Sequence, residues 1–392
     1  MDFTLNKDIV LPADGCNGVL IGRAWVPGDP GGPSVVILAE HGVYDITGRW
    51  PTVSMLLEAE DPVVAAVTAD MVRLGSIDAL LANSIAGHCD PSKPYFLAPI
   101  DLQAVKAAGV TFVDSLMERV IEEHAKGDAG AAEEIRNTIG REIGTDIAGI
   151  RPGSEEAAKL KQALIDRGLW SQYLEVGIGP DAEVFTKAQP MAAVGIGAEI
   201  GIPSHSTWNN PEPEAVVVVN SRGEAVGATL GNDVNLRDVE GRSALLLGKA
   251  KDNNASCAVG PFIRLFDQTF DFDDLRGIDI SLAVEGDDGF SLMGSSSMSQ
   301  ISRDPLDLVR QTISNTHQYP DGFVLFTGTM FAPTKDRGEP GRGFTHKAGD
   351  LVIIASPALG ALVNRVNHCE SITPWTFGCG ALLKNLSARG VL

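Results

Sequence analysis

The second half of the chain follows a β-type pattern, and this pattern limits the fold more than any other feature of the sequence. From Glu175 onward, short apolar runs are separated by Gly, Asn and Asp residues, which favour turns. Three of these runs are Val216 to Val219, Ile278 to Val284 and Leu351 to Ile354. The spacing predicts a β-rich domain made of many short strands.

The first half combines apolar runs with helical patterns. Val35 to Ala39 predicts a strand, and a Leu, Ala and Val pattern from Ser54 to Leu81 predicts helix. The segment from Cys89 to Tyr95 contains two prolines and predicts a linker. We therefore expect an N-terminal α/β domain over residues 1–98 and a catalytic domain over residues 99–392.

An amphipathic helix follows the predicted linker. Apolar residues recur at spacings of three and four from Val113 to about Lys126, while Ser115, Glu118 and Glu122 share another stripe. The Ala- and Glu-rich stretch from Gly127 to Gly168 predicts two or more surface helices, the last opening at Ser154. The predicted fold class is α+β, with a smaller N-terminal domain, a β-rich catalytic domain and a helical insert.

Composition argues against several classes of function. The chain of 392 residues has a formal net charge of -20, from 51 acidic and 31 basic residues, and no basic run. Because phosphate contacts need clustered Lys and Arg, nucleic acid is not an expected partner. Met1 to Ala13 lacks a signal-peptide pattern, and no stretch reaches the roughly 18 apolar residues of a spanning helix. Five cysteines without a CxxC pair are typical of a reducing compartment, so we expect a cytoplasmic protein without a membrane partner.

Three carboxylates fall on two strand-like segments joined by a turn. Glu212 and Glu214 are two residues apart, so they point to one face of the first strand. If Arg222 and Gly223 are the two turn residues of a hairpin, Asp233 lies opposite Glu212. The sequence therefore predicts that three carboxylates meet on one face, provided that the register is not shifted by one residue.

Carboxylates brought together in this way repel one another, so a cation must neutralise them or some must stay protonated. Oxygen-only ligands favour a hard cation, with Mg²⁺ as the first choice and Mn²⁺ or Ca²⁺ as alternatives, whereas zinc would recruit His or Cys. A solvated hairpin without a metal is the alternative that the pattern leaves open.

Other chemical motifs receive little support. The seven histidines have no HxxxH or HxH spacing, and no GxGxxG, P-loop or GxSxG motif is present. The run Gly294 to Ser297 is interpreted as a flexible loop. Nucleotide binding and covalent catalysis are therefore not expected.

Several motifs together resemble the fumarylacetoacetate hydrolase superfamily, in the same order and spacing from about residue 99 to the end. The segments that carry the resemblance are Pro211 to Glu214, Gly231 to Asp238, Lys251 to Pro261, Ser302 to Asp304, Phe326 to Thr329 and Trp375 to Phe377. The resemblance implies a mixed β-sandwich roll for the catalytic domain, and it commonly accompanies homo-oligomers, a dimer or a tetramer.

The resemblance also implies roles for individual residues. It assigns the metal to the same three carboxylates, Glu212, Glu214 and Asp233. It places Lys251 near the metal and the substrate. It assigns the acid end of the substrate to Gly328 and Thr329.

One position departs from the hydrolases of that superfamily, which carry an aromatic residue, then His, then Glu at three-residue spacing. The same spacing here reads Phe112, Ser115 and Glu118. Serine cannot act as the general base that an imidazole provides, so hydrolysis of a carbon–carbon bond is disfavoured. With the insert and Trp170 to Glu175, this departure resembles the 2-keto-3-deoxy-pentonate dehydratase branch.

The expected function is a metal-dependent hydro-lyase that converts a 2-keto-3-deoxy-pentonate, derived from D-xylose or L-arabinose, to 2,5-dioxopentanoate. Glu118 is expected to remove a C3 proton, directly or through a water held by Ser115. Lys251 is expected to polarise the C2 oxygen or to transfer protons, and these two roles are interchangeable. Two alternatives stay open: an acylpyruvate hydrolase or oxaloacetate-type decarboxylase, and a non-catalytic binding protein that the metal stabilises.

Overall fold

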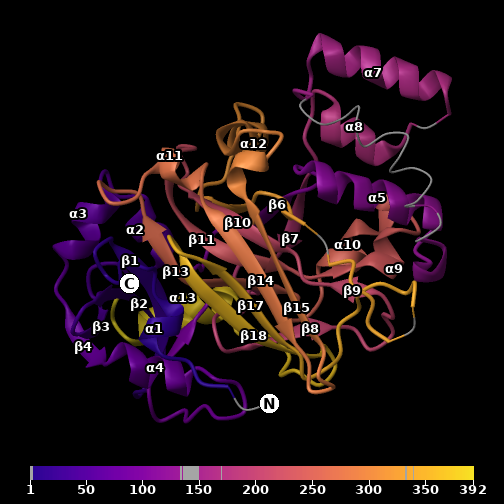
Figure 1. The fold of residues 1–392 in the computed structure, drawn as a ribbon. Helices are drawn as coiled ribbons and strands as arrows, with labels where there is room; N and C mark the ends of the chain where they lie inside the picture. Colours follow the sequence, from indigo (N-terminus) through magenta and orange to yellow (C-terminus); the bar gives the residue numbers. More distant parts are fainter. Residues whose placement is uncertain (1–2, 133–134, 136–149, 169, 332, 339) are drawn as a thin grey trace.

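The fold is that of a computed structural model, which describes residues 3–132, 135, 150–168, 170–331, 333–338 and 340–392 (Figure 1). Within the predicted Gly127 to Gly168 insert, residues 133–134 and 136–149 lie outside the described residues. None of the helices in the described ranges is long and apolar enough to cross a membrane.

Two sheets form the body of the molecule. The larger sheet has eleven strands in the described residues, in the order β4-β3-β2-β1-β13-β11-β10-β16-β6-β7, with β5 paired to β1. Its strands are β1 (Leu20–Val26), β2 (Gly32–Ala39), β3 (Gly42–Asp45), β4 (Val72–Gly75), β5 (Tyr95–Leu97), β6 (Ala104–Ala108), β7 (Val184–Ala188), β10 (Pro213–Val219), β11 (Ala225–Asp233), β13 (Cys257–Leu265) and β16 (Phe323–Phe326).

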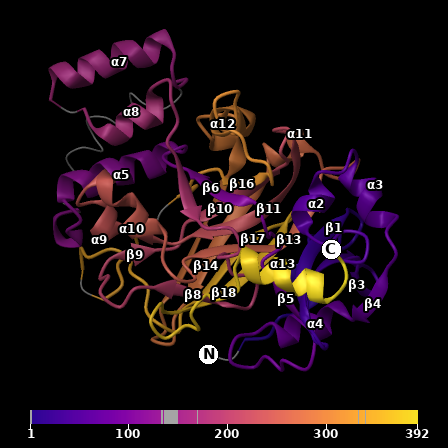
Figure 2. The same ribbon diagram turned by 180° about the vertical axis from the view of Figure 1, so that it is seen from behind.

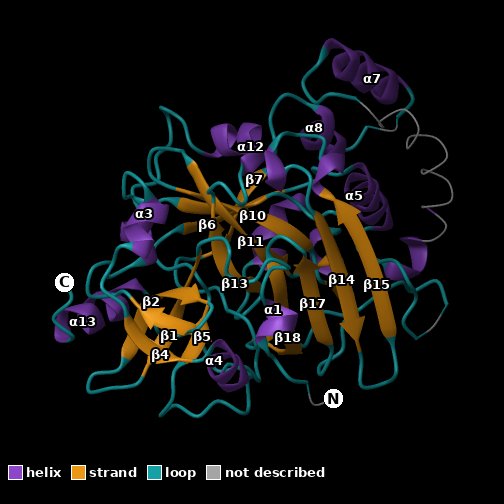
Figure 3. Ribbon diagram, turned by 60° about the vertical axis from the view of Figure 1, so that its left-hand side comes forward, coloured by secondary structure: helices purple, strands orange, loops and turns teal. Residues whose placement is uncertain are grey.

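The second sheet has the order β15-β14-β17-β18-β8 and stands beside the larger one in Figure 3. A two-stranded ribbon, β9 and β12, lies near the candidate site. These strands are β8 (Glu199–Ile202), β9 (Asn209–Asn210), β12 (Asn235–Leu236), β14 (Asp279–Glu285), β15 (Ser291–Ser297), β17 (Leu351–Ser356) and β18 (Gly360–His368).

The apolar run of β10 explains how the core is arranged. Val217 and Val219 belong to the core cluster that also contains Leu282 of β14 and Ile354 of β17, so this face packs against the second sheet. Val216 and the alternate positions belong to a separate cluster with β1, β2 and the first helices. Because both faces are covered, the strand is apolar at every position from Ala215 to Val219 instead of alternating.

Helices cover the ends and edges of the two sheets. α5, α7 and α8 form an arm beyond the sandwich, and the C-terminal α13 packs against β2 (Figures 1 and 2). The helices are α1 (Lys7–Val10), α2 (Val53–Leu57), α3 (Pro62–Val67), α4 (Ile77–Asn83), α5 (Val113–Ala125), α7 (Glu155–Asp166), α8 (Gln172–Ile178), α9 (Arg237–Glu240), α10 (Leu247–Lys251), α11 (Phe272–Leu275), α12 (Pro305–Thr312) and α13 (Cys379–Ala388).

The α+β class is confirmed, together with the amphipathic helix α5 and the helix α7 that Ser154 caps. Two local predictions are wrong. The segment from Ser54 to Leu81 contains three short helices and strand β4, because Asp61 and Ser76 each cap a new helix and interrupt the pattern. The run Gly294 to Ser297 is not a loop, since it pairs along β14 as part of β15.

Strands on both sides of residue 98 share the larger sheet. Leu20 and Ile21 of β1 pair with Arg264 and Ile263 of β13. Hydrogen bonding therefore continues from the N-terminal part into the C-terminal part, and the boundary near residue 98 stays a prediction.

Candidate metal centre

The three carboxylates come together on the hairpin of β10 and β11. Glu214 pairs with Gly231, and the Asp233 amide donates a hydrogen bond to the Glu212 carbonyl at 3.1 Å. Asp233 therefore lies opposite Glu212, as the sequence predicts. One oxygen from each of the three side chains lies within 4.8 Å of the others, and all three residues are buried.

The turn that creates this register differs from the prediction. The Gly223 amide donates to the Asn220 carbonyl at 3.0 Å, and Val219 pairs with Ala225. This shifts the pairing by one residue relative to a two-residue turn at Arg222 and Gly223. A bulge one position further along the strands shifts it back, so the carboxylates still face one another.

Two buried lysines contact Asp233, one at each oxygen. Lys251 Nζ donates to Asp233 Oδ2 at 3.1 Å and also to Glu212 Oε2, while Lys187 Nζ lies 2.9 Å from Asp233 Oδ1. Burial alone would raise the pKa of Asp233, but the two ammonium groups lower it below its usual value. Burial would likewise lower the pKa of Lys251, yet attraction to Asp233 and Glu212 raises it above its usual range, so Lys251 is an ammonium.

Glu214 is the carboxylate with the least compensation. Within the described part of the chain no lysine or arginine forms an ion pair with it, and its hydrogen bond comes from the Gly328 amide at 2.7 Å. Burial and repulsion from Asp233 and Glu212 raise the pKa of Glu214 well above 4.5. A cation beside this oxygen would remove the repulsion.

The donor set fits a hard divalent cation. All of the candidate ligand atoms are carboxylate oxygens, and no His or Cys joins the group among the described residues. Carboxylate oxygens are the ligands that Mg²⁺, Mn²⁺ and Ca²⁺ prefer. Glu212, Glu214 and Asp233 therefore form a candidate site for one of these ions.

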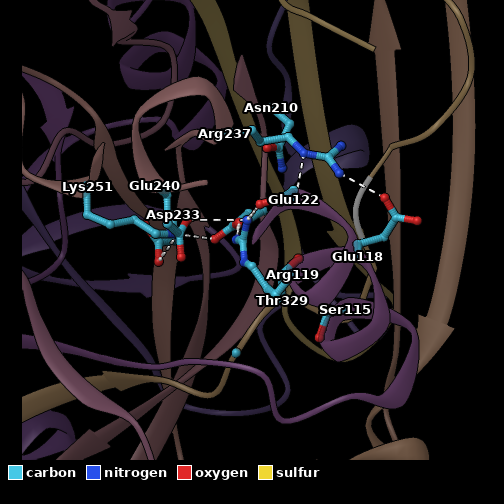
Figure 4. A network of polar contacts seen from close by, with 12 residues as sticks. Ser115, Glu118, Arg119, Glu122, Asn210, Asp233, Arg237, Glu240, Lys251 and Thr329 are labelled. Carbon is cyan, nitrogen blue, oxygen red and sulfur yellow. Dashed lines mark hydrogen bonds and ion pairs between the residues drawn. The ribbon is translucent and has the colours of Figure 1, made fainter. Parts of the chain in front are cut away.

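A network of buried charges connects α5 to the carboxylates (Figure 4). Arg119 lies between Glu122, at 2.6 Å, and Glu212, whose Oε1 accepts from Arg119 Nη2. Arg237 Nε donates to the other oxygen of Glu122 at 2.6 Å. Arg237 Nη2 donates to Glu118 at 2.8 Å, so Glu118 joins the trio through two arginines.

Ser115 and Glu118 lie on α5, and in Figure 4 both are to the right of Lys251 and Asp233. Ser115 is buried, and its hydroxyl donates to the Phe112 carbonyl at 2.9 Å, within its own helix. The Glu118 side chain keeps 12% of its surface exposed. The structure thus places these two residues near the network but shows no direct contact between them and the carboxylate trio.

Gly328 and Thr329 border Glu214. Gly328 has a φ of +98°, and a Cβ there would lie 2.1 Å from Thr111 Oγ1, so glycine fits both the backbone and the space. The Thr329 hydroxyl donates to the Phe331 carbonyl at 3.0 Å. The structure therefore brings this predicted pair to the metal centre, whereas its role toward a substrate stays a prediction.

Glu240 is a further buried acid of the network. It lies on α9, one helical turn after Arg237, and its Oε2 is 3.3 Å from Arg119 Nη1. Burial raises the pKa of Glu240 to about 7, although Arg119 and Lys251 oppose the shift. A carboxyl with such a pKa changes its charge near neutral pH.

Glu240→Gln is expected to change how stability depends on pH in the metal-free protein. The folded-state pKa of Glu240 lies above the usual value of 4.5. The contribution of this carboxyl to the free energy of unfolding is therefore complete below pH 4.5 and is lost as pH rises to about 7. At pH 8 the variant should be more stable than wild type by up to about 3 kcal/mol, and the difference should shrink at pH 4.5. Urea unfolding in EDTA at both pH values measures this, and a difference independent of pH would contradict it.

The sequence patterns missed several charged residues of the centre. Arg119 and Glu122 lie on the predicted helix, Arg237 lies in a segment used for the resemblance, and Lys187 interrupts an otherwise uncharged strand. A single charge inside an apolar or strand-like run was the available signal. Periodicity identifies apolar faces, but it does not indicate which charged side chains become buried.

Comparison with known proteins identifies a family for this chain. The family model for the fumarylacetoacetate (FAA) hydrolase C-terminal domain matches residues 170–367. The chain is 31% identical over 234 residues to a 2-dehydro-3-deoxy-D-arabinonate dehydratase of Saccharolobus solfataricus, covering 60% of this chain and 72% of that protein. It is 33% identical over 214 residues to a probable 2-keto-3-deoxyxylonate dehydratase of Haloferax volcanii, covering 54% and 68%.

Solved structures share the fold. One is a 2-keto-3-deoxy-D-arabinonate dehydratase complexed with magnesium and 2,5-dioxopentanoate, with a TM-score of 0.59 and 22% identity, covering 89% of this chain and 99% of that one. Another is a fumarylacetoacetate hydrolase from Exiguobacterium antarcticum, with a TM-score of 0.54 and 16% identity, covering 89% and 99%. From the family match, the identity to the curated relatives and the shared fold, the chain belongs to the fumarylacetoacetate hydrolase family.

Proposed function

We propose that the chain is a lyase that removes water from a 2-keto-3-deoxy-pentonate and forms 2,5-dioxopentanoate with the help of a divalent metal, Mg²⁺ as the first choice. The observation that carries the proposal is the buried carboxylate trio, in which Glu214 has no ion-pair partner among the described residues. The curated relatives are named as dehydratases of such acids, and one solved neighbour holds magnesium and 2,5-dioxopentanoate. These names support the substrate class.

The chemistry needs a positive charge beside the C2 oxygen of the substrate. When bound, the metal supplies that charge and makes the neighbouring C3 protons more acidic. Glu212, Glu214 and Asp233 would hold it. Lys251 is an ammonium that reaches Glu212 and Asp233, so it can donate a hydrogen bond to an oxygen of the substrate beside them.

Glu118 is our proposal for the residue that removes the C3 proton. Its side chain is partly exposed, whereas Glu122, one turn further along α5, is buried and accepts from two arginines. Departure of the C4 hydroxyl as water then leaves an unsaturated acid, and proton shifts convert it to the aldehyde. Thr329 is proposed to bind the carboxylate end through its main-chain amide, because the Gly328 amide already donates to Glu214 and the Thr329 hydroxyl to the Phe331 carbonyl.

A hydrolytic reaction is less well supported by the same helix. The Ser115 hydroxyl donates to the Phe112 carbonyl and lacks the basicity of an imidazole, so it is not suited to activate water. Dehydration needs no such base–water pair. The position of Ser115 therefore favours elimination over hydrolysis.

The proposal is tested by incubating the purified protein with 2-keto-3-deoxy-D-arabinonate or with 2-keto-3-deoxy-xylonate. The buffer contains about 5 mM Mg²⁺, which is enough to fill a weak metal site. NMR should identify 2,5-dioxopentanoate, and EDTA should abolish its formation. Pyruvate released from an acylpyruvate or from oxaloacetate would instead indicate the hydrolase or decarboxylase alternative. Metal binding without turnover of any of these acids would favour a binding protein.

A further inference from the structure

Lys187 is a fully buried lysine that the proposed reaction does not use. It lies on β7, which is the last strand in the order of the larger sheet, and its side chain has no exposed surface. A lysine usually places its ammonium in water, and burial without partners costs several kcal/mol. Its contacts must therefore compensate for the lost hydration.

The Lys187 ammonium joins two parts of the metal centre. It lies 2.9 Å from Asp233 Oδ1, and it donates to the main-chain carbonyls of Val234, at 3.1 Å, and Lys251. The Ser256 hydroxyl donates to the same Lys251 carbonyl at 2.8 Å. Lys187 thus contacts the side chain of a candidate metal ligand and the backbone of the residue that carries the second ammonium.

The Lys251 carbonyl belongs to the last residue of α10, where helical carbonyls lack partners inside the helix. A cation at this end of a helix is favourable, because the carbonyl dipoles point toward it. Lys187 therefore fixes the end of α10 from which the Lys251 side chain extends. That side chain then reaches Asp233 Oδ2, so the two lysines hold the two oxygens of one carboxylate.

We propose that Lys187 is a positioning residue that holds Asp233 and the main chain of Lys251 in the geometry that binds the divalent metal. This inference rests on the metal centre of the proposed function, but not on the substrate or the reaction. The Lys187 side chain has no exposed surface that a substrate could touch, so it acts through Asp233 and Lys251.

A different role for Lys187 makes the opposite prediction. If the ammonium only lowered the negative charge of the centre, its removal would strengthen the binding of a cation, since the carboxylates would attract it more strongly. If it holds Asp233 and Lys251 in place, its removal weakens binding, because Asp233 can turn and the Lys251 carbonyl keeps only its hydrogen bond from Ser256. The sign of the change therefore separates the two roles.

The experiment measures metal affinity by calorimetry on the full chain, without substrate, using Mn²⁺ and Mg²⁺ at pH 7.5. Lys187→Met keeps an unbranched side chain that is one atom shorter, and it removes the charge and the donors. Loss of a residue that hydrogen-bonds a metal ligand usually lowers metal affinity by about 10-fold to 100-fold. We expect the affinity of Lys187→Met for the metal to fall by about that factor. An unchanged or a tighter affinity in the folded variant overturns the proposal.

Arg303→Met is the matched control for loss of a buried cation. Arg303 is also buried and donates to main-chain carbonyls, those of Val176 at 2.9 Å and Gly179 at 2.7 Å, which lie in and just after α8. This variant should lose stability but keep the wild-type affinity for the metal. An equal loss of affinity in both variants would show a general effect of destabilisation and would overturn the proposal.

Ser256→Ala provides a second test if Lys187→Met does not fold. It removes the hydrogen bond to the Lys251 carbonyl, together with the acceptor of Lys187 Nζ and of the Asn253 amide, and it leaves every charge in place. One such bond is worth about 1 kcal/mol, so affinity should fall about threefold to tenfold, and an unchanged affinity counts against the proposal. A wild-type protein that binds neither ion would overturn both this inference and the metal centre, whereas failure of Lys187→Met alone leaves the proposed function intact.

Discussion

Glu214→Gln should make the metal-free protein more stable while removing its metal-dependent activity. Burial and the neighbouring carboxylates raise the pKa of Glu214 well above 4.5, so its stabilising contribution is complete below pH 4.5 and is lost as pH rises. At pH 7.5 the neutral amide avoids that loss, so we expect the metal-free variant to unfold at a higher temperature than wild type. Replacing a residue that only hydrogen-bonds a metal ligand lowers metal affinity or activity by up to about 100-fold. Loss of a direct ligand should therefore lower turnover by more than that factor.

Thermal unfolding in EDTA and in Mg²⁺ measures both effects. Wild type should be stabilised by Mg²⁺, because a ligand that binds only the folded state shifts the unfolding equilibrium, whereas the variant should not respond. Asp350→Asn is the control: Asp350 is also buried, but Arg337 compensates its charge and His346 lies within hydrogen-bond distance, so the change should destabilise. A Glu214→Gln protein that is less stable in EDTA, or that keeps its response to Mg²⁺, would contradict the metal centre.

Arg237→Met should produce the largest loss of stability in the charge network. Arg237 is buried, donates to Glu118 at 2.8 Å and Glu122 at 2.6 Å, and stacks over the Trp208 ring at 4.5 Å. Its removal leaves a buried oxygen of Glu122 without a cation. Breaking a buried ion pair from one side usually costs about 3–5 kcal/mol, and we expect a loss of that order in urea unfolding.

Arg264→Met separates this effect from the general loss of a buried arginine. Arg264 also lies over an aromatic ring, Phe270 at 4.9 Å, but its partner Asp14 keeps 34% of its side-chain surface exposed. Water can solvate that carboxylate when the arginine is gone, so the loss should be smaller. Equal losses in the two variants would show that the network around Glu122 is not specially sensitive.

The sequence was sufficient for the carboxylate trio because two local rules determine it. Alternation along a strand puts Glu212 and Glu214 on one face, and antiparallel pairing puts Asp233 opposite Glu212. The details of the turn were wrong, yet the bulge restored the register. The trio can be predicted from the sequence because all three carboxylates lie within one hairpin.

The helix α5 shows where such reasoning stops. Its apolar stripe was predicted, and the helix forms as Val113–Ala125. The prediction treated Ser115 and Glu118 as the chemical residues of the helix, whereas Arg119 is the residue that reaches Glu212. Arg119 becomes buried because carboxylates from β10 and α9 surround it, and these are far away in the sequence.

The sequence by itself determined the β-rich fold class, the amphipathic helix and the three carboxylates, since each follows from spacing within one short segment. Only the tertiary structure decided which charges compensate them. Lys187 comes from β7, Lys251 from α10 and Arg119 from α5, and they meet the hairpin only after the sheets and helices pack. Ion pairing between buried groups depends on distance and on the exclusion of water, and neither quantity exists until the chain is folded.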